Sequence, residues 1–204
     1  YKRNGQGCSL NRFLALLVTS VFVLTSSGCA NDSLAEQFRD GDNKNYIAGD
    51  GTVTEFAPGS RPKAASWSGV TESGESISSE QLEGVITVMN FWYAGCAPCR
   101  IEMPELIELQ DEFLPEGVQF IGVNVRDSAA TSLAFARKIN MNFPSVMDAK
   151  TGSVVLGFTG VVTPQAVPTT LVIDAEGNVS ARVLGRIDMG ILRALITTNI
   201  KERS

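Results

Sequence analysis

The stretch that decides the fold is residues 85–100, which read VITVMNFWYAGCAPCR. It opens with a continuous β-branched and aromatic run, which is typical of a strand buried on both faces. Cys96 and Cys99 follow with two residues between them. Pro98 suits the first turn of a helix because it lacks an N–H that would have no partner there. The stretch therefore predicts a buried strand, a short loop and a helix that begins at the cysteine pair.

Apolar and amphipathic segments continue this pattern toward the C-terminus. We expect further strands at residues 118–125, 169–174 and 179–184, and helices at residues 96–114, 128–141 and 188–201. The helix residues predicted to face inward are Met103, Leu106, Ile107, Phe113, Leu114, Leu133, Ala136, Ile139, Ile191, Leu192, Leu195 and Ile196. A turn at 175–178 joins the last two strands into a hairpin. This order predicts an α/β fold with a mixed central sheet of four core strands flanked by helices.

Three further features refine this fold. We expect residues 61–84 to add short strands at an edge of the sheet. Residues 142–166 are long for an unstructured connection, so we expect local structure there, with a short helix at 153–158. Pro104 lies inside the first helix and predicts a kink.

The N-terminal segment has the features of a bacterial export signal. Three basic residues precede an apolar run at 13–24, whose helical length of about 18 Å is too short for a hydrocarbon core of about 30 Å. Gly28-Cys29 resembles the lipobox of bacterial lipoproteins. We therefore expect cleavage before Cys29 and lipid attachment to it. Ordinary cleavage nearby and a retained anchor are the alternatives.

The segment after Cys29 is rich in Asp, Asn and Gly, which predicts a flexible tether. A partly ordered N-terminal extension is the alternative. The expected organisation is a lipoprotein-type signal peptide at residues 1–28, a tether at 29–60 and one folded domain at 61–204. The domain would then lie on the extracytoplasmic face of the bacterial cell membrane, held by a lipid anchor.

The composition excludes several function classes. The chain has 204 residues, a formal net charge of −5 and 44% hydrophobic residues, which indicates a globular protein of one domain with appendages. The acidic balance argues against nucleic acid as a partner, because phosphate binding needs clustered Lys and Arg. The sequence contains no histidine, which excludes Ser-His and Cys-His catalysis and His-ligated metal sites.

Four cysteines are present, and two of them define the candidate site. Cys8 lies in the leader and Cys29 is the lipidation candidate, so Cys96 and Cys99 remain for the folded domain. One such pair cannot supply the four ligands of a structural zinc site, and a disulfide across so short a loop adds little stability through chain entropy. The pair is therefore interpreted as redox-active, with no metal and no cofactor besides its own disulfide.

The surroundings of the pair resemble the thioredoxin superfamily. Residues 90–100 read NFWYAGCAPCR, residues 102–104 read EMP, and residues 167–174 read VPTTLVID. Together they are similar to the TlpA/ResA-like membrane-anchored thiol–disulfide oxidoreductases. The resemblance covers about residues 61–200 and implies a thioredoxin-like fold with short added N-terminal strands.

The two cysteines are expected to have different roles. A thiolate, not a thiol, attacks a disulfide sulfur, and the unpaired N–H groups at a helix N-terminus favour negative charge. Cys96 is therefore expected to be the more exposed nucleophile. Cys99, one helical turn further and more buried, is expected to resolve the mixed disulfide.

Four residues are expected to form the substrate-binding surface. The resemblance implies that Pro168 is a cis-proline against the cysteine pair, which leaves the backbone of Val167 free to pair with an extended substrate. Trp92 and Pro98 are expected to line the same site. The alternative for Trp92 is a packed core aromatic.

Glu102 is the candidate acid–base residue. Thioredoxin has a buried Asp where this chain has Asn90, and an amide cannot accept a proton in that role. Glu102 lies three residues after Cys99, and the ResA-like subgroup implies an acid–base role for a Glu at this position. The alternative is a solvated helix carboxylate, which describes Glu105 and Glu108 better.

Three functions are considered for a chain with these features. The first is a reductant that takes electrons from a membrane thiol transporter and reduces disulfides of exported proteins, with apocytochrome c as the substrate that the resemblance implies. The second is a dithiol oxidase that inserts disulfides into secreted proteins. The third is non-enzymatic, either a copper chaperone or a structural binding module. The two-residue spacer and the missing histidine disfavour the copper chaperone. A peroxidase would need a lone peroxidatic cysteine in a T-x-x-C setting, which the chain lacks.

Overall fold

The computed structural model describes residues 46–48, 53–163 and 166–203, and of 46–48 the backbone alone. The chain divides into two units between Asn43 and Lys44, and the described residues all belong to the second unit. The predicted signal peptide and Cys29 therefore lie outside the described residues.

A seven-stranded mixed sheet forms the centre of the domain, in the spatial order β1-β2-β9-β8-β5-β6-β7. Its strands are β1 (Tyr46–Ala48), β2 (Val53–Glu55), β5 (Thr87–Trp92), β6 (Gln119–Asn124), β7 (Ser145–Met147), β8 (Thr169–Ile173) and β9 (Val179–Leu184). The strands β5, β6 and β7 run parallel, whereas β8 pairs antiparallel with both β5 and β9. The predicted α/β fold and the mixed sheet are confirmed.

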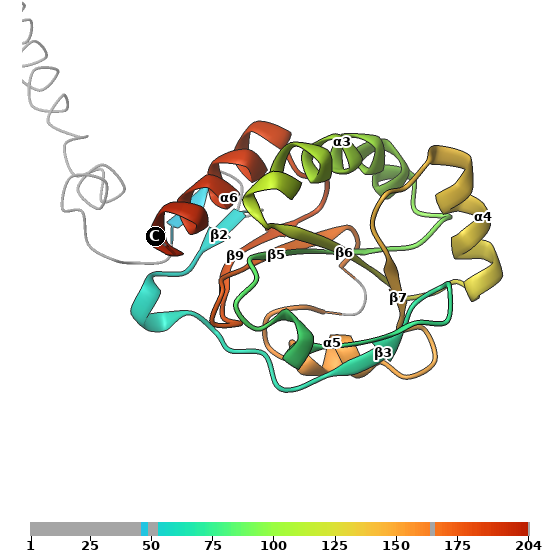
Figure 1. Cartoon of the computed structure of the whole chain (residues 1–204), viewed down its shortest axis with the longest axis horizontal. Coiled ribbons are helices and arrows are strands. Elements are labelled where there is room, and N and C mark those ends of the chain that lie inside the picture. Colours follow the sequence, from blue (N-terminus) through green and yellow to red (C-terminus); the bar gives the residue numbers. More distant parts are fainter. Residues whose placement is uncertain (1–45, 49–52, 164–165, 204) are drawn as a thin grey trace, which may run out of the picture. The chain divides into compact units, whose positions relative to one another are not determined.

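Helices cover both faces of the sheet. They are α3 (Ala97–Phe113), α4 (Ala129–Ile139), α5 (Ser153–Gly157) and α6 (Met189–Arg203). Figure 1 shows α3 and α6 on one side of the sheet, and α5 with the strand β3 (Ser68–Val70) on the other. Single turns of 3₁₀-helix lie at Pro58–Ser60, Ser79–Leu82 and Leu114–Glu116.

Two apolar cores result from the alternation of side chains along β5. Val88 and Trp92 face the helix α3, whereas Met89 and Phe91 face α5. The α3-side core includes Val88, Trp92, Cys96, Cys99, Met103, Leu106, Phe135, Leu192, Leu195 and Ile196. The α5-side core includes Trp67, Met89, Phe91, Ile121, Val123, Val146, Val154, Phe158 and Leu171. Because successive strand residues point to opposite faces, Asn90 must project toward α3.

The helices follow the predicted pattern with two errors. Leu114 is 59% exposed and Ile191 is 39% exposed, although both were expected to face inward. Leu114 begins the 3₁₀ turn that ends α3, so its direction no longer follows the helical repeat. Ile191 lies one residue before Leu192 on α6, about 100° around the helix from the buried face. The helix α3 continues through Pro104, and the kink stays a prediction.

The N-terminal part of the domain begins earlier than expected. The strands β1 and β2 fall within the predicted tether, where β2 pairs with the free edge of β9. Within the segment for which a partly ordered extension was the alternative, residues 46–48 form a strand. Residues 61–84 contain the predicted short strands, but β3 and β4 (Ser76–Ser78) pair with each other in a separate two-stranded sheet. Isolated bridges join this segment to the chain around the main sheet, from Lys63 to Asn178 and from Thr71 to Val146 of β7.

Residues 142–166 contain the predicted short helix, α5, and also the edge strand β7, which the sequence reasoning missed. A three-residue strand is too short to show an alternating pattern. Of the helices in the described part of the chain, none has the length and apolar character needed to cross a membrane.

Candidate active site

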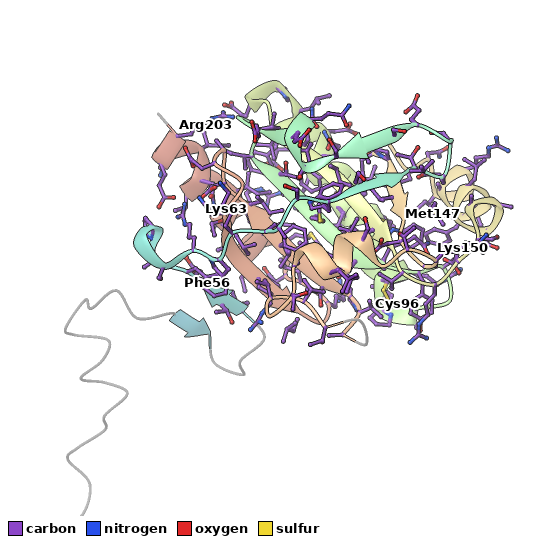
Figure 2. The ribbon with its side chains drawn as sticks, turned by 90° about the horizontal axis from the view of Figure 1, so that it is seen from below. Phe56, Lys63, Cys96, Met147, Lys150 and Arg203 are labelled. Atoms are coloured by element: carbon purple, nitrogen blue, oxygen red, sulfur yellow. A yellow bond between two sulfur atoms is a disulfide. The ribbon has the colours of Figure 1, made fainter. Side chains whose placement is uncertain are left out.

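The cysteine pair lies where β5 ends and α3 begins. Cys96 and Cys99 form a disulfide with an S–S distance of 2.07 Å and a Cα–Cα distance of 5.3 Å. Cys96 is the N-cap of α3, and its Sγ accepts a hydrogen bond from the backbone N–H of Cys99 at 3.3 Å. Figure 2 shows Cys96 at the same end of the domain as Met147 and Lys150, opposite Phe56 and Arg203. The N–H of Cys99, in the first turn of α3, thus points at the sulfur that is expected to carry the negative charge.

Exposure distinguishes the two sulfur-bearing residues only slightly. Cys96 is 4% exposed and Cys99 is 1% exposed, and the adjacent Ala97 and Pro98 are exposed. This order agrees with Cys96 as the residue that an incoming disulfide reaches first. Pro98 is accessible to a substrate, as expected for a residue that lines the site.

Trp92 cannot touch a substrate in this structure, because its side chain is 0% exposed. Its indole Nε1 donates to Ser145 Oγ at 3.1 Å, and its ring lies 5.2 Å from the Phe135 ring between centroids. The packed-aromatic alternative therefore describes Trp92, and its assignment to the substrate-contacting surface is wrong. The residue supports the cysteine pair from the α3-side core, to which both belong.

The peptide bond between Val167 and Pro168 is cis, as predicted. Pro168 is buried, and its carbonyl accepts a hydrogen bond from the N–H of Gly185 at 2.8 Å. Val167 is half-buried and packs against the α3-side core that contains both cysteines. The role of Val167 in substrate pairing stays a prediction.

Glu102 is buried, with 0% of its surface exposed, so the solvated-carboxylate alternative is wrong. Its Oε1 accepts a hydrogen bond from Asn90 Nδ2 at 2.9 Å, and its Oε2 accepts one from the backbone N–H of Ile187 at 3.2 Å. Asn90 Nδ2 also donates to Thr170 Oγ1 at 3.0 Å, since these residues are opposite each other in the β5–β8 pairing. Asn90 Oδ1 is buried and has no hydrogen-bond partner.

Burial raises the pKa of Glu102 to about 7, because desolvation disfavours the charged form. The hydrogen bonds from Asn90 and Ile187 and the charge of Arg186 oppose this rise, and the charge of Glu105 adds to it. Glu102 is thus a carboxyl group that changes its protonation state near neutral pH, one helical turn from Cys99.

A second set of side chains surrounds the loop 93–95 that leads into Cys96. Asp127 Oδ2 accepts hydrogen bonds from the N–H of Ala94 at 2.6 Å and from Asn124 Nδ2 at 2.8 Å. The sequence reasoning missed these residues. Their position at and just after the end of the strand β6 was an available signal, because carboxyl ends of neighbouring parallel strands meet at the same edge of a sheet.

Comparison with known proteins places this site in a family. The sequence profile of the AhpC/TSA family matches residues 61–182, more than half of the chain. The chain is similar to the thiol-disulfide oxidoreductase ResA of Halalkalibacterium halodurans, with 35% identity over 106 residues that cover 52% of this chain and 57% of that relative.

Two solved structures are similar to this chain in both fold and sequence. A DsbF homologue from Corynebacterium diphtheriae is 28% identical with a TM-score of 0.65, over 78% of this chain and 99% of that one. A thiol:disulfide interchange protein of the thioredoxin family from Chlorobium tepidum TLS is 28% identical with a TM-score of 0.62, over 69% and 97% of the two chains.

The fold and the cysteine pair at the strand–helix junction define a thioredoxin-like protein. The chain belongs to the AhpC/TSA family. It spans 57% of the length of the ResA relative described above. The predicted thioredoxin-like resemblance is confirmed.

Proposed function

We propose that this protein is an extracytoplasmic thiol–disulfide oxidoreductase that reduces disulfides of exported proteins, with apocytochrome c during cytochrome c maturation as a leading substrate. The observation that carries the proposal is the Cys96–Cys99 disulfide at the N-terminus of α3. The names of the relatives support it, since they are thiol–disulfide proteins.

The reaction is a two-electron exchange. In the reduced protein, the Cys96 thiolate attacks one sulfur of a substrate disulfide, so that a mixed disulfide forms and one substrate thiolate leaves. Cys99 loses its proton and attacks Cys96 Sγ, which releases the second substrate thiolate. The substrate has then gained two electrons, and the protein holds the disulfide seen here. A thiol donor at the membrane must return two electrons to complete the cycle.

The buried carboxyl group favours the reducing direction over the dithiol oxidase alternative. Strong oxidants stabilise their reduced form by stabilising the thiolate. An ionised Glu102 one turn from Cys99 acts in the opposite sense, because like charges disfavour each other. The reduced form should therefore give up its electrons more readily than that of an oxidase.

The direction can be tested by trapping the thiol state in cells. Acid quenching followed by alkylation should find Cys96 and Cys99 mainly reduced, and a mainly oxidised pair would favour the oxidase. A Cys99→Ser variant should accumulate mixed disulfides through Cys96, whereas Cys96→Ser should accumulate none and should be inactive. Mass spectrometry of the trapped adducts would identify the substrates.

We also propose that Cys29 carries a lipid that holds the domain at the membrane. The short apolar run before Gly28-Cys29 supports this. Because β1 begins at Tyr46, the proposed tether reduces to residues 30–45. The intact mass of membrane-extracted protein tests the proposal: acyl mass on an N-terminal Cys29 is expected, and another mature N-terminus without acyl mass would contradict it.

A further inference from the structure

Two arginine side chains contact the loop 93–95 directly before the nucleophilic cysteine. The guanidinium carbon of Arg126 lies 4.4 Å from the centroid of the Tyr93 ring. That ring packs beside Gly95, because a Cβ atom placed on Gly95 would lie 3.3 Å from Tyr93 Cε2. Arg126 thus contacts the ring of Tyr93, which packs beside Gly95, the residue directly before Cys96.

Arg100 approaches the same loop from the first turns of α3. Its Nη1 donates a hydrogen bond to the carbonyl oxygen of Ala94 at 3.1 Å, and its guanidinium carbon lies 5.2 Å from the Phe135 ring centroid. Stacking on an aromatic face holds a guanidinium group in place without using its N–H donors. Both charges are therefore positioned near Cys96 and do not move freely on long side chains.

These guanidinium groups have N–H donors that no described residue of the protein uses. Both residues are exposed, and neither forms an ion pair within the described part of the chain. No side-chain donor of Arg126 meets a protein acceptor among the described residues, and Arg100 uses one donor for the Ala94 carbonyl. A guanidinium group offers five N–H donors in a geometry that fits a carboxylate.

Among the side chains that contact the loop 93–95, positive charges outnumber negative ones, although the whole protein is acidic. Asp127 is the carboxylate that contacts the loop, and it is half-buried and bonded to Ala94 and Asn124. Glu105 is paired with Arg186 at 3.1 Å. Lys150 lies at the same end of the domain as Cys96 (Figure 2). Two guanidinium groups and one carboxylate therefore contact the loop that leads into Cys96.

We propose that Arg100 and Arg126 are specificity-determining residues that select disulfides flanked by acidic side chains. The proposal rests on the proposed function and names a substrate class for it. A substrate carboxylate would bind the free N–H donors while the Cys96 thiolate attacks the neighbouring sulfur. The arginines would also offset the repulsion between that thiolate and an acidic substrate.

Matched peptide disulfides test this selection. Two peptides that differ only in having Glu or Lys on both sides of the cysteine are oxidised to their disulfide dimers. The rate constant for oxidation of the reduced full-length protein is measured with each dimer at low and at high salt. The ratio of the two rate constants, acidic over basic, is the readout. Wild-type protein should prefer the acidic dimer, and high salt should reduce the preference.

The variants R126Q and R100Q should each lower this ratio about fivefold, which is about 1 kcal/mol, the upper end of what an exposed ion pair contributes. R203Q is the matched control, because Arg203 lies at the opposite end of the domain (Figure 2), and it should leave the ratio unchanged. R126K retains the charge and should keep the preference. Thermal unfolding shows whether each variant remains folded.

An unchanged ratio in both R126Q and R100Q would overturn the inference, and so would an equal drop in R203Q. Loss of the preference in R126K would contradict its electrostatic basis. These outcomes differ from a failure of the proposed function, in which reduced wild-type protein would exchange with neither dimer.

Discussion

The side-chain amide of Asn90 donates a hydrogen bond to Oε1 of Glu102 at 2.9 Å, so the residue that replaces the buried aspartate of thioredoxin binds the carboxyl group proposed to take over its role. The two residues come from different elements, β5 and α3. Asn90 can donate to the carboxylate form and thereby opposes the rise in pKa that burial causes. Desolvation and this hydrogen bond are therefore the two largest influences on the pKa of Glu102.

Replacing Glu102 with Gln should change how the reactivity of Cys96 depends on pH. In the wild type, ionisation of Glu102 near pH 7 places a negative charge close to the thiols and disfavours the thiolate. Glu102→Gln removes that charge. The curve of Cys96 alkylation rate against pH should therefore lose the change near pH 7 that the ionisation of Glu102 causes. Reductase activity in cells should fall. Overlaying curves and unchanged activity would show that Glu102 has only a structural role.

The same variant should change the pH dependence of stability in the oxidised protein. A carboxyl pKa raised from 4.5 to about 7 means that the folded state holds a proton that the unfolded state releases between these pH values. The wild-type free energy of unfolding should therefore fall as pH rises through this window, by about 3 kcal/mol in total.

Glu102→Gln has no ionisable group there and should lack this decrease. The altered hydrogen bonds of the variant change the free energy of unfolding by an amount that does not depend on pH. The slope of the free energy of unfolding against pH is therefore the diagnostic quantity. Urea unfolding at pH 5 and pH 8 measures it for both proteins. Equal slopes would mean that Glu102 ionises in the folded state at an ordinary pH.

Asn90→Asp should couple two buried carboxyl groups. The new oxygen would occupy the position of the amide nitrogen, 2.9 Å from Glu102 Oε1. Two carboxylates this close share one proton, so the pair should remain partly protonated well above pH 7. The loss of stability between pH 5 and pH 8 should be steeper than in the wild type. Asn90→Ala removes the donor without adding charge and is the control. Its loss of stability between pH 5 and pH 8 should be less steep than that of Asn90→Asp.

Gly122→Ala should destabilise the domain through Trp92. A Cβ atom at Gly122 would lie 2.2 Å from Ser145 Oγ and 2.7 Å from Trp92 Nε1, so the hydrogen bond between them must break or shift. Overpacking of this kind costs about 1–3 kcal/mol. Gly59→Ala is the matched control, because no heavy atom lies within 4 Å of its added Cβ. Thermal unfolding of both variants checks the prediction, and equal melting temperatures would contradict it.

The elements that the sequence predicted well are those with a strong local signal. The strand at 85–93 appears as β5, the helix after Cys96 as α3, and the hairpin as β8 and β9. Apolar runs and helix-start residues are properties of neighbouring positions, so they can be read without knowing the fold. The strands β1 and β2 were missed because each has only three residues and forms by pairing with a neighbouring edge, β2 with β9 and β1 with β2.

By itself, the sequence determined the α/β order, the redox pair at a helix N-terminus and the absence of histidine chemistry. The tertiary structure alone decided that Glu102 is buried against Asn90, that Trp92 is a core residue, and that Arg126 lies on the Tyr93 ring. Desolvation and contacts between elements distant in the chain depend on which strands pair and which helix faces meet. Those choices minimise exposed apolar area and unpaired polar groups over the whole domain, and no local pattern contains them.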